Sequence, residues 1–269
     1  MNHAVGVEHH YRPGVAMVSL KRPEQHNALD GQLVRELTLA FQSLANRDEI
    51  RVVVLTGEGR SFCAGADLQA ILSASEAGLE TATDEGRSLF DLMMAVSSCP
   101  MPVIGRVNGA AIGGGMGLVC CCDLVVAAER AKFGFSEVRL GLIPAIITPF
   151  VLSKISENDA KELYMTGERF SALRAQELGL VQRVTAESHM DDIVVEWVDQ
   201  LLLGAPGAQA AAKELLRAVG RPDVEPWREV TSELFARRVV SREGREGIRA
   251  FLEKRNPDWN AAYSDDNGV

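Results

Sequence analysis

The stretch PVIGRVNGAAIGGGMGL, residues 102–118, carries the clearest fold signal in the chain. It predicts a buried strand over 102–107, a glycine-rich turn, and a helix that begins near Gly114. A further apolar strand is predicted soon afterwards, over 124–127. Strands that alternate with a helix in this way are typical of an α/β fold.

The residues before this stretch repeat the same pattern. Two strands are predicted over 15–20 and 51–56, and the second of them, RVVVLT, is apolar enough to be buried on both faces. Asp30 can cap a helix between them. That helix is predicted from an apolar stripe at helical spacing, formed by Leu33, Leu37, Ala40, Phe41 and Leu44.

The second half is predicted to be mostly helical. The remaining elements expected along the chain are a loop over 72–84, a helix over 84–96, helices capped by Ser156 and begun by Pro206, a last strand over 181–184 and an amphipathic helix over 242–255. We therefore expect an α/β core over residues 1–200 and a helical region over 201–269.

Composition and charge exclude several function classes. Acidic residues outnumber basic ones by 37 to 28 in 269 residues, a net charge of -9 without a basic stripe, so no nucleic-acid partner is expected. No apolar run is long enough to span a membrane, and we expect a cytoplasmic protein. The consecutive cysteines 120–122 suit buried packing in a reducing compartment better than disulfides. No metal-ligand spacing is present, so no metal is expected.

The glycine triplet 113–115 lies where a strand ends and a helix begins. Its N–H groups are unsatisfied donors at the positive end of the helix dipole, an arrangement that stabilises an oxyanion. The structural alternative is close packing of the helix on the strand. The spacing matches neither the dinucleotide fingerprint nor the P-loop.

A second loop of small residues, Ala64 to Ala66, could bring another N–H group toward the first. Two converging N–H donors form an oxyanion hole. The alternative is a plain tight turn followed by Asp67 as a helix cap. Cys63 is expected to pack in the core, because no histidine is placed to activate it as a nucleophile.

Five segments together resemble the crotonase family, the enoyl-CoA hydratases and isomerases. They are KRPEQHNAL (21–29), SFCAGADL (61–68), PVIGRVNGAAIGGGMGL (102–118), CDLVVAAERAKFGFSEVRLGLIP (122–144) and FLEKRNP (251–257). The resemblance implies a spiral of strand, strand, helix turns and a helical C-terminal region that forms a homotrimer, often stacked into a hexamer. It also implies an acyl-CoA thioester as substrate, with no cofactor besides the coenzyme A that the substrate carries.

The resemblance also implies roles for single residues. The N–H groups of Ala64 and Gly114 would hold the thioester oxygen, and Glu137 would move protons. The substrate and CoA path would be lined by Arg22, His26, Ala28, Ala66, Asp67, Leu68, Gly113, Gly117, Pro144, Phe251 and Lys254, the last near the CoA phosphates.

One family position differs. Two-glutamate hydratases of this family carry their first glutamate where this chain has Gly117, one helical turn from Gly114. We expect Glu137 to work without that partner, or with a substitute among Glu76, Glu80 and Asp84, and the absent side chain to leave room for a substituted acyl group.

The expected function is reversible hydration of a branched or carboxylated 2-enoyl-CoA. The run over 136–150 resembles the methylglutaconyl-CoA hydratase-like branch. Arg139 would neutralise a substrate carboxylate or, alternatively, form a salt bridge within the fold. Two other functions stay open: isomerisation of a 3-enoyl-CoA to the 2-enoyl form, and binding of acyl-CoA without catalysis.

Overall fold

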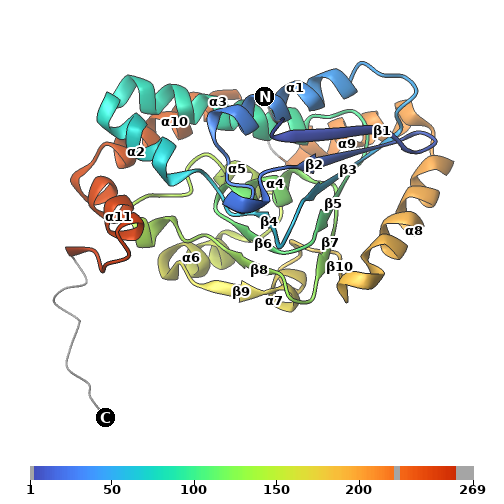
Figure 1. The fold of residues 1–269 in the computed structure, drawn as a ribbon. Coiled ribbons are helices and arrows are strands. Elements are labelled where there is room, and N and C mark those ends of the chain that lie inside the picture. The colour runs from blue at the N-terminus through green and yellow to red at the C-terminus, as the bar shows by residue number, and fades with distance from the viewer. Residues whose placement is uncertain (1–2, 221–224, 259–269) are drawn as a thin grey trace, which may run out of the picture.

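Two β-sheets lie within a layer of helices in the computed structural model, which describes residues 3–220 and 225–258 (Figure 1). The strands are β1 (Val5–Arg12), β2 (Val15–Leu20), β3 (Val52–Gly57), β4 (Ser61–Cys63), β5 (Val103–Val107), β6 (Ala110–Ile112), β7 (Leu124–Ala128), β8 (Lys132–Gly134), β9 (Arg169–Ser171) and β10 (Arg183–Thr185). The main helices are α1 (Gly31–Leu44), α2 (Leu68–Ala77), α3 (Leu79–Ser97), α4 (Gly114–Cys121), α5 (Thr148–Val151), α6 (Glu157–Thr166), α7 (Ala172–Glu177), α8 (Met190–Leu203), α9 (Pro206–Gly220), α10 (Glu225–Val239) and α11 (Arg242–Leu252). Short 3₁₀ turns are η1 (Pro23–Gln25), η2 (Glu137–Leu140) and η3 (Glu187–His189).

The chain alternates between the two sheets. The six-stranded sheet has the order β1-β2-β3-β5-β7-β10 and is parallel apart from the β1–β2 pair. The four-stranded sheet has the order β4-β6-β8-β9 and is parallel apart from the β8–β9 pair. The turns that begin at β3, β5 and β7 each place one strand in the first sheet and the next strand in the second, as in β3, β4 and then α2. This confirms the predicted α/β spiral of strand, strand, helix turns.

Strand β3 shows why its sequence is almost entirely apolar. All of its residues are buried, because side chains on both faces enter a core. Val53 and Leu55 belong to the main core, whereas Val52 and Val54 belong to a second core under α8. The prediction of a strand buried on both faces is confirmed. Figure 1 shows α8 beside the sheet, on the side of the molecule opposite α2 and α11.

Several predicted helix starts are also confirmed. The Asp30 carboxylate accepts a hydrogen bond from Leu33 N at 2.8 Å and caps α1. The Ser156 hydroxyl accepts one from Asp159 N at 3.1 Å at the start of α6. Pro206 begins α9.

The prediction of a loop over 72–84 is wrong. Helix α2 continues to Ala77 and α3 begins at Leu79, not at Asp84, with only Gly78 between them at φ 111°. Buried side chains on both helices, among them Ala74 and Ala82, pack inward at helical spacing and hold this segment in place. At the other end of the chain, α11 stops at Leu252, before the predicted 255, because Lys254 adopts a left-handed φ of 54°.

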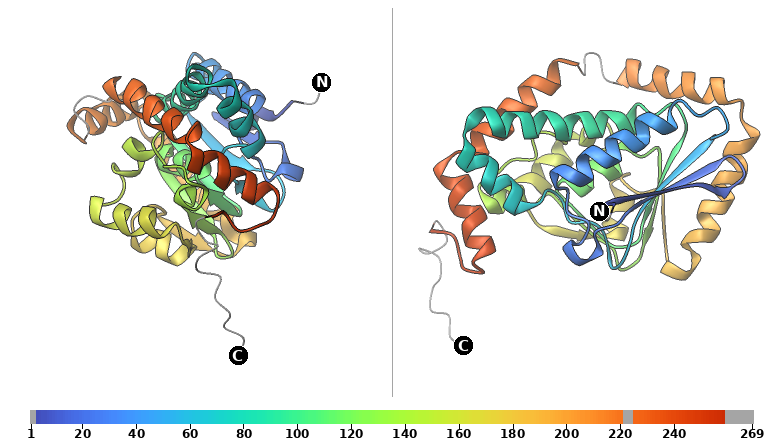
Figure 2. Two further views of the ribbon diagram at one scale, coloured as in Figure 1. Left: turned by 90° about the vertical axis from the view of Figure 1, so that its left-hand side faces the viewer. Right: turned by 45° about the horizontal axis from the view of Figure 1, so that its top comes forward.

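Helices α2, α3, α10 and α11 gather on one side of the molecule (Figure 2). Residues of all four helices line a cavity there. Arg245 Nε donates to Ser75 Oγ at 2.9 Å, and Arg249 forms an ion pair with Glu76 at 3.0 Å, so α11 is fastened to α2.

The division into residues 1–200 and 201–269 stays a prediction, and 221–224 and 259–269 lie outside the described residues. Within the described ranges, no helix has the length and apolar character that crossing a membrane requires.

Candidate active site

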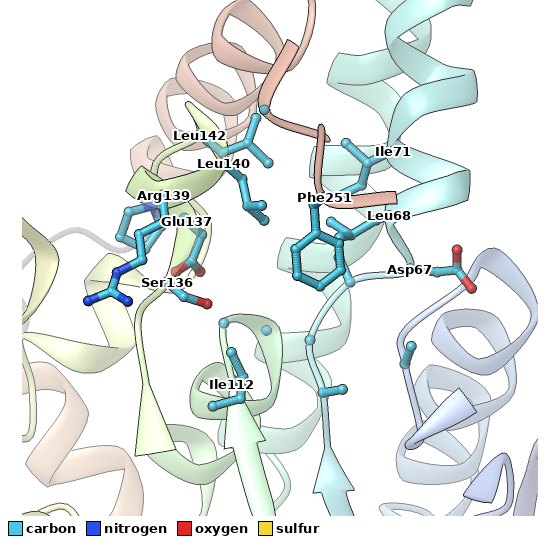
Figure 3. A pocket seen from close by; sticks show the side chains of 18 of the residues that line it. Asp67, Leu68, Ile71, Ile112, Ser136, Glu137, Arg139, Leu140, Leu142 and Phe251 are labelled. Carbon is cyan, nitrogen blue, oxygen red and sulfur yellow. The ribbon is translucent and has the colours of Figure 1, made fainter. Parts of the chain in front are cut away.

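A cavity of about 830 Å³ lies between the glycine turn before α4, the loop before α2, η2 and α11 (Figure 3). Most of its wall is apolar. The apolar side chains that line it include Leu68, Ile71, Leu89, Met93, Ile112, Leu140, Leu142, Ile143, Ile146, Ile147, Phe235 and Phe251. A cavity of this size and composition suits a ligand with a long apolar part.

The glycine turn supplies one free backbone donor to this cavity. Gly113 has φ 53° and its N–H donates to the Gly134 carbonyl at 3.0 Å. Gly114 is the first residue of α4, and no described residue accepts a hydrogen bond from its N–H. That N–H is therefore available to a ligand at the positive end of the helix.

The loop before α2 supplies a second donor at Ala66. Leu29 N donates to the Gly65 carbonyl at 2.7 Å and Asp67 N donates to the Leu29 carbonyl at 3.0 Å, the pattern of a parallel bridge between Leu29 and Ala66. In such a bridge the N–H of Ala66 itself faces the opposite side. A Cβ atom on Gly114 would lie 3.6 Å from Ala66 N, so the Ala66 and Gly114 amides are neighbours.

The expected donor at Ala64 is engaged elsewhere. Ala64 N donates to the His26 carbonyl at 3.0 Å, so this N–H holds the loop before α1 and is not free for a ligand. Gly65, between the two alanines, has φ 95°. This bend prevents the Ala64 and Ala66 amides from pointing the same way, as they would in a regular strand. The structure therefore favours Ala66 with Gly114 over the expected pair of Ala64 with Gly114.

Glu137 lies against the glycine turn. Its Oε1 atom would be 3.1 Å from a Cβ atom on Gly113, and Figure 3 shows the carboxyl group reaching toward the turn above Ile112. Among the residues described, none forms a hydrogen bond with the buried Oε2 atom. Burial raises the pKa of Glu137 to about 7. A carboxyl group with this pKa can both accept and release a proton near neutral pH.

The position of Gly117 is closed. A Cβ atom there would overlap Ile147 Cγ2 and would lie 3.0 Å from both Cε and Sδ of Met93. The expectation that the missing side chain leaves room for a substituted acyl group is wrong, because Ile147 and Met93 fill that space. A glutamate at this position would have to displace the side chains of Ile147 and Met93.

Gly117→Ala is therefore expected to lower the free energy of unfolding by about 1–3 kcal/mol through overpacking. The gain in helix propensity, about 1 kcal/mol at most, opposes this effect and is smaller. Urea denaturation of wild type and variant measures the difference. The penalty should shrink in an Ile147→Ala background, and a Gly117→Ala protein more stable than wild type would contradict the packing described.

The suggested substitutes for a second acid lie outside the cavity wall. Glu76 pairs with Arg249 at 3.0 Å and Asp84 pairs with Arg87 at 2.9 Å, and neither these two nor Glu80 lines the cavity. Asp67 does line it, but its carboxylate caps α2, accepts from Gln69 N at 3.0 Å and points away from the cavity in Figure 3. Apart from Asp67, Glu137 is the only acidic residue in the cavity wall within the described part of the chain.

The structure brings most of the predicted site residues to one cavity. Those that line it are His26, Ala28, Ala64, Ala66, Asp67, Leu68, Gly113, Gly114, Glu137, Pro144 and Phe251. Arg22, Gly117 and Lys254 are not part of the wall. The Arg22 guanidinium pairs with Asp30 at 3.0 Å and donates to the Ala28 carbonyl at 2.6 Å, so it stabilises the loop before α1.

Other lining residues were not predicted from the sequence. Leu89 and Met93 enter the cavity from α3, and Phe235 enters from α10. Their helical spacing identifies only an apolar face and cannot show whether that face meets protein or ligand. Ser136 and Arg169 also line the cavity. Ser136 lies within the family segment 122–144, from which no role for it was inferred, and Arg169 lies outside the five segments.

The cysteines are packed in the core. All five are free and buried, and burial raises the pKa of Cys63 to about 12, so its thiolate is not populated near neutral pH. This confirms the expected packing role of Cys63 and of the cysteines at 120–122. No group of three or more potential ligands that could hold a metal occurs among residues 3–220 and 225–258.

Comparison with known proteins identifies the family. Residues 10–262 match the family model described as enoyl-CoA hydratase/isomerase, and the chain belongs to this family of enzymes. The chain is 32% identical over 246 residues to 2,3-dehydroadipyl-CoA hydratase of Escherichia coli, covering 91% of this chain and 94% of that protein. It is 33% identical over 254 residues to carnitinyl-CoA dehydratase of Proteus mirabilis, covering 92% and 95%.

A solved structure gives the same result for the fold. The enoyl-CoA hydratase from Mycobacterium avium superposes with a TM-score of 0.86 at 36% sequence identity, covering 96% of this chain and all of that chain. The resemblance to the crotonase family, found from the sequence motifs, is therefore confirmed.

Proposed function

We propose that this protein catalyses the reversible addition of water to a 2-enoyl-CoA. The observation that carries the proposal is the pair of free amides, at Ala66 and Gly114, next to the buried carboxyl group of Glu137. The thioester oxygen would accept hydrogen bonds from both amides, which stabilises the negative charge that develops when a nucleophile adds to C3.

Glu137 would handle both proton steps. Its carboxylate takes a proton from water while the water oxygen bonds to C3, and the resulting enolate then takes the same proton at C2. One proton and one hydroxyl group are thereby added, and Glu137 returns to its starting state. A pKa of about 7 suits both halves of this cycle.

Isomerisation is the second candidate, and the closed position at Gly117 favours it. With Ile147 and Met93 filling the place of a second acid, Glu137 could take a proton from C2 of a 3-enoyl-CoA and return it to C4. A binder without catalysis is disfavoured, because a buried carboxyl group whose Oε2 atom has no hydrogen-bond partner among the described residues lowers stability, and a binding role gives no reason to keep it.

Two substrates separate the candidates. Purified protein receives a 2-enoyl-CoA and a 3-enoyl-CoA of equal chain length, and mass spectrometry identifies the products. A 3-hydroxyacyl-CoA from the first substrate supports the hydratase. Migration of the double bond without any 3-hydroxyacyl product would replace it with the isomerase, and tight binding without either reaction would leave only the binder.

The pH profile tests the role of Glu137. Because the ionised carboxylate must take the proton from water, kcat/KM for hydration is expected to rise with pH and reach a plateau above about 7. Initial rates in buffers of constant ionic strength measure the profile. A profile that is flat through this range would show that another group takes the proton.

The proposed substrate class is an enoyl-CoA with a branched or carboxylated acyl chain, of the methylglutaconyl type, and Arg139 supports the carboxylated form. Arg139 lines the cavity, and its Nε donates to the Thr166 carbonyl at 3.2 Å, whereas none of the described carboxylates pairs with it. The E. coli relative is named for 2,3-dehydroadipyl-CoA. Arg139→Gln should lower kcat/KM for a carboxylated enoyl-CoA and leave that for an unsubstituted one unchanged.

A homotrimer or a dimer of trimers is proposed as the assembly. Apolar side chains on α9 and at the end of α8 are exposed in the single chain: Leu203 (81%), Leu215 (63%) and Leu216 (72%). Figure 2 shows α9 on the outside of the helical layer, where another subunit could cover it. Sedimentation equilibrium tests this, and a monomer at all concentrations would contradict it.

A cytoplasmic location and the absence of nucleic-acid partners remain proposals from the sequence.

A further inference from the structure

The serine before Glu137 does not behave like the other serines at helix starts. Ser156, Ser171 and Ser241 each accept a hydrogen bond from a backbone N–H in the first turn of the following helix. Ser136 occupies the same position before η2, but its hydroxyl makes no such bond. Its hydroxyl is therefore not used to stabilise the helix start.

The Ser136 hydroxyl faces the cavity. Ser136 lines the wall, and Figure 3 shows its side chain beside the Glu137 carboxyl group, both extending from the segment that leads into η2. No hydrogen bond joins Ser136 Oγ to any residue in the described ranges. Glu137 Oε2 likewise has no partner there. Two adjacent polar groups without protein partners thus lie at the point where proton transfer is proposed.

Hydration requires a second group near Glu137. The attacking water must be oriented toward C3, and one carboxylate fixes only one of its two hydrogen atoms. The closed position at Gly117 cannot supply the second contact, and Asp67 is committed to capping α2. A serine hydroxyl can accept the other hydrogen of the water molecule.

We propose that Ser136 Oγ holds the water that adds to C3, an inference that rests on the proposed hydratase activity. The water donates one hydrogen bond to Ser136 Oγ and the other to the Glu137 carboxylate, which takes that proton as the oxygen bonds to C3. In the reverse reaction Ser136 binds the departing 3-hydroxyl group. Ser136 gains and loses no atoms, and Glu137 carries the transferred proton to C2.

Two measurements on each variant separate this role from a structural one. The first is hydration of a 2-enoyl-CoA. The second is exchange of the C2 protons of a saturated acyl-CoA with deuterium oxide, which needs Glu137 and the two amides but no added water. Ser136→Ala is expected to lower kcat for hydration about tenfold, the effect of one lost hydrogen bond, with KM and the exchange rate unchanged.

Two further substitutions at position 136 and one control variant complete the set. Ser136→Thr keeps the hydroxyl and should keep most of the hydration rate. Ser136→Cys replaces the oxygen with a weakly hydrogen-bonding sulfur and should lose it as Ser136→Ala does. Ser171→Ala is the matched control, because Ser171 accepts from Arg174 N at 3.2 Å. It should lower the melting temperature without changing the ratio of hydration to exchange, whereas Ser136→Ala should change the ratio without lowering the melting temperature.

The outcomes distinguish two failures. Unchanged hydration in Ser136→Ala and Ser136→Cys would overturn the role of Ser136 and leave the hydratase in place. A parallel loss of hydration and exchange would also overturn it, since Ser136 would then act by supporting Glu137. A wild-type protein that exchanges C2 protons but never adds water would overturn both the hydratase and this inference.

Discussion

Glu137→Gln is expected to lower the rates of hydration and of C2 proton exchange by about 10²–10⁴-fold, because the glutamine side chain cannot take or release the proton. The substitution keeps the size of the side chain and removes only its charge and its acidity. Binding of a saturated acyl-CoA should persist, since the free amides of Ala66 and Gly114 and the apolar wall are unchanged. Stopped-flow rates and calorimetric titration measure the two quantities separately.

The stability of the same variant provides the control. Burial raises the pKa of Glu137 from 4.5 to about 7, so the folded state favours the protonated form. Wild type should therefore be stabilised by this group below pH 4.5 and should lose that contribution as the pH rises through 7. Glu137→Gln lacks this dependence and should melt no lower than wild type at pH 8. Near-normal turnover in a well-folded variant would show that Glu137 is not the proton carrier.

Local features of the fold could be predicted from the sequence because short stretches of chain determine them. The apolar run at β3, the Asp30 cap of α1 and the glycines before α4 each act on neighbouring residues. The structure confirms all three. The resemblance of five segments, in their order along the chain, also identified the family.

Features that depend on contacts between distant segments could not be predicted. The space beside Gly117 is filled by Ile147 and Met93, which come from other parts of the chain, so the sequence could show only that a side chain was missing. The break at Gly78 is short enough that α2 and α3 follow each other almost directly, where a loop over 72–84 was expected. Tertiary packing decided both points.

The amide proposed to bind the thioester oxygen is the clearest case of this kind, and it leads to the second large prediction. Ala66→Pro removes the N–H that faces the Gly114 amide. It spares the bridge to Leu29, which uses the Gly65 carbonyl and the Asp67 N–H. Loss of one oxyanion donor is expected to lower kcat about 10²–10³-fold, equivalent to about 2.7–4 kcal/mol of transition-state stabilisation.

Ala64→Pro is the matched comparison, because it removes the neighbouring N–H that donates to the His26 carbonyl at 3.0 Å. It should cost about 1 kcal/mol of unfolding free energy and change kcat far less than Ala66→Pro does. The exchange rate at C2 and the melting temperature of both variants separate the two effects. If Ala64→Pro abolished exchange while Ala66→Pro stayed active, the assignment would return to Ala64, and a ligand would then have to displace the His26 carbonyl from that amide.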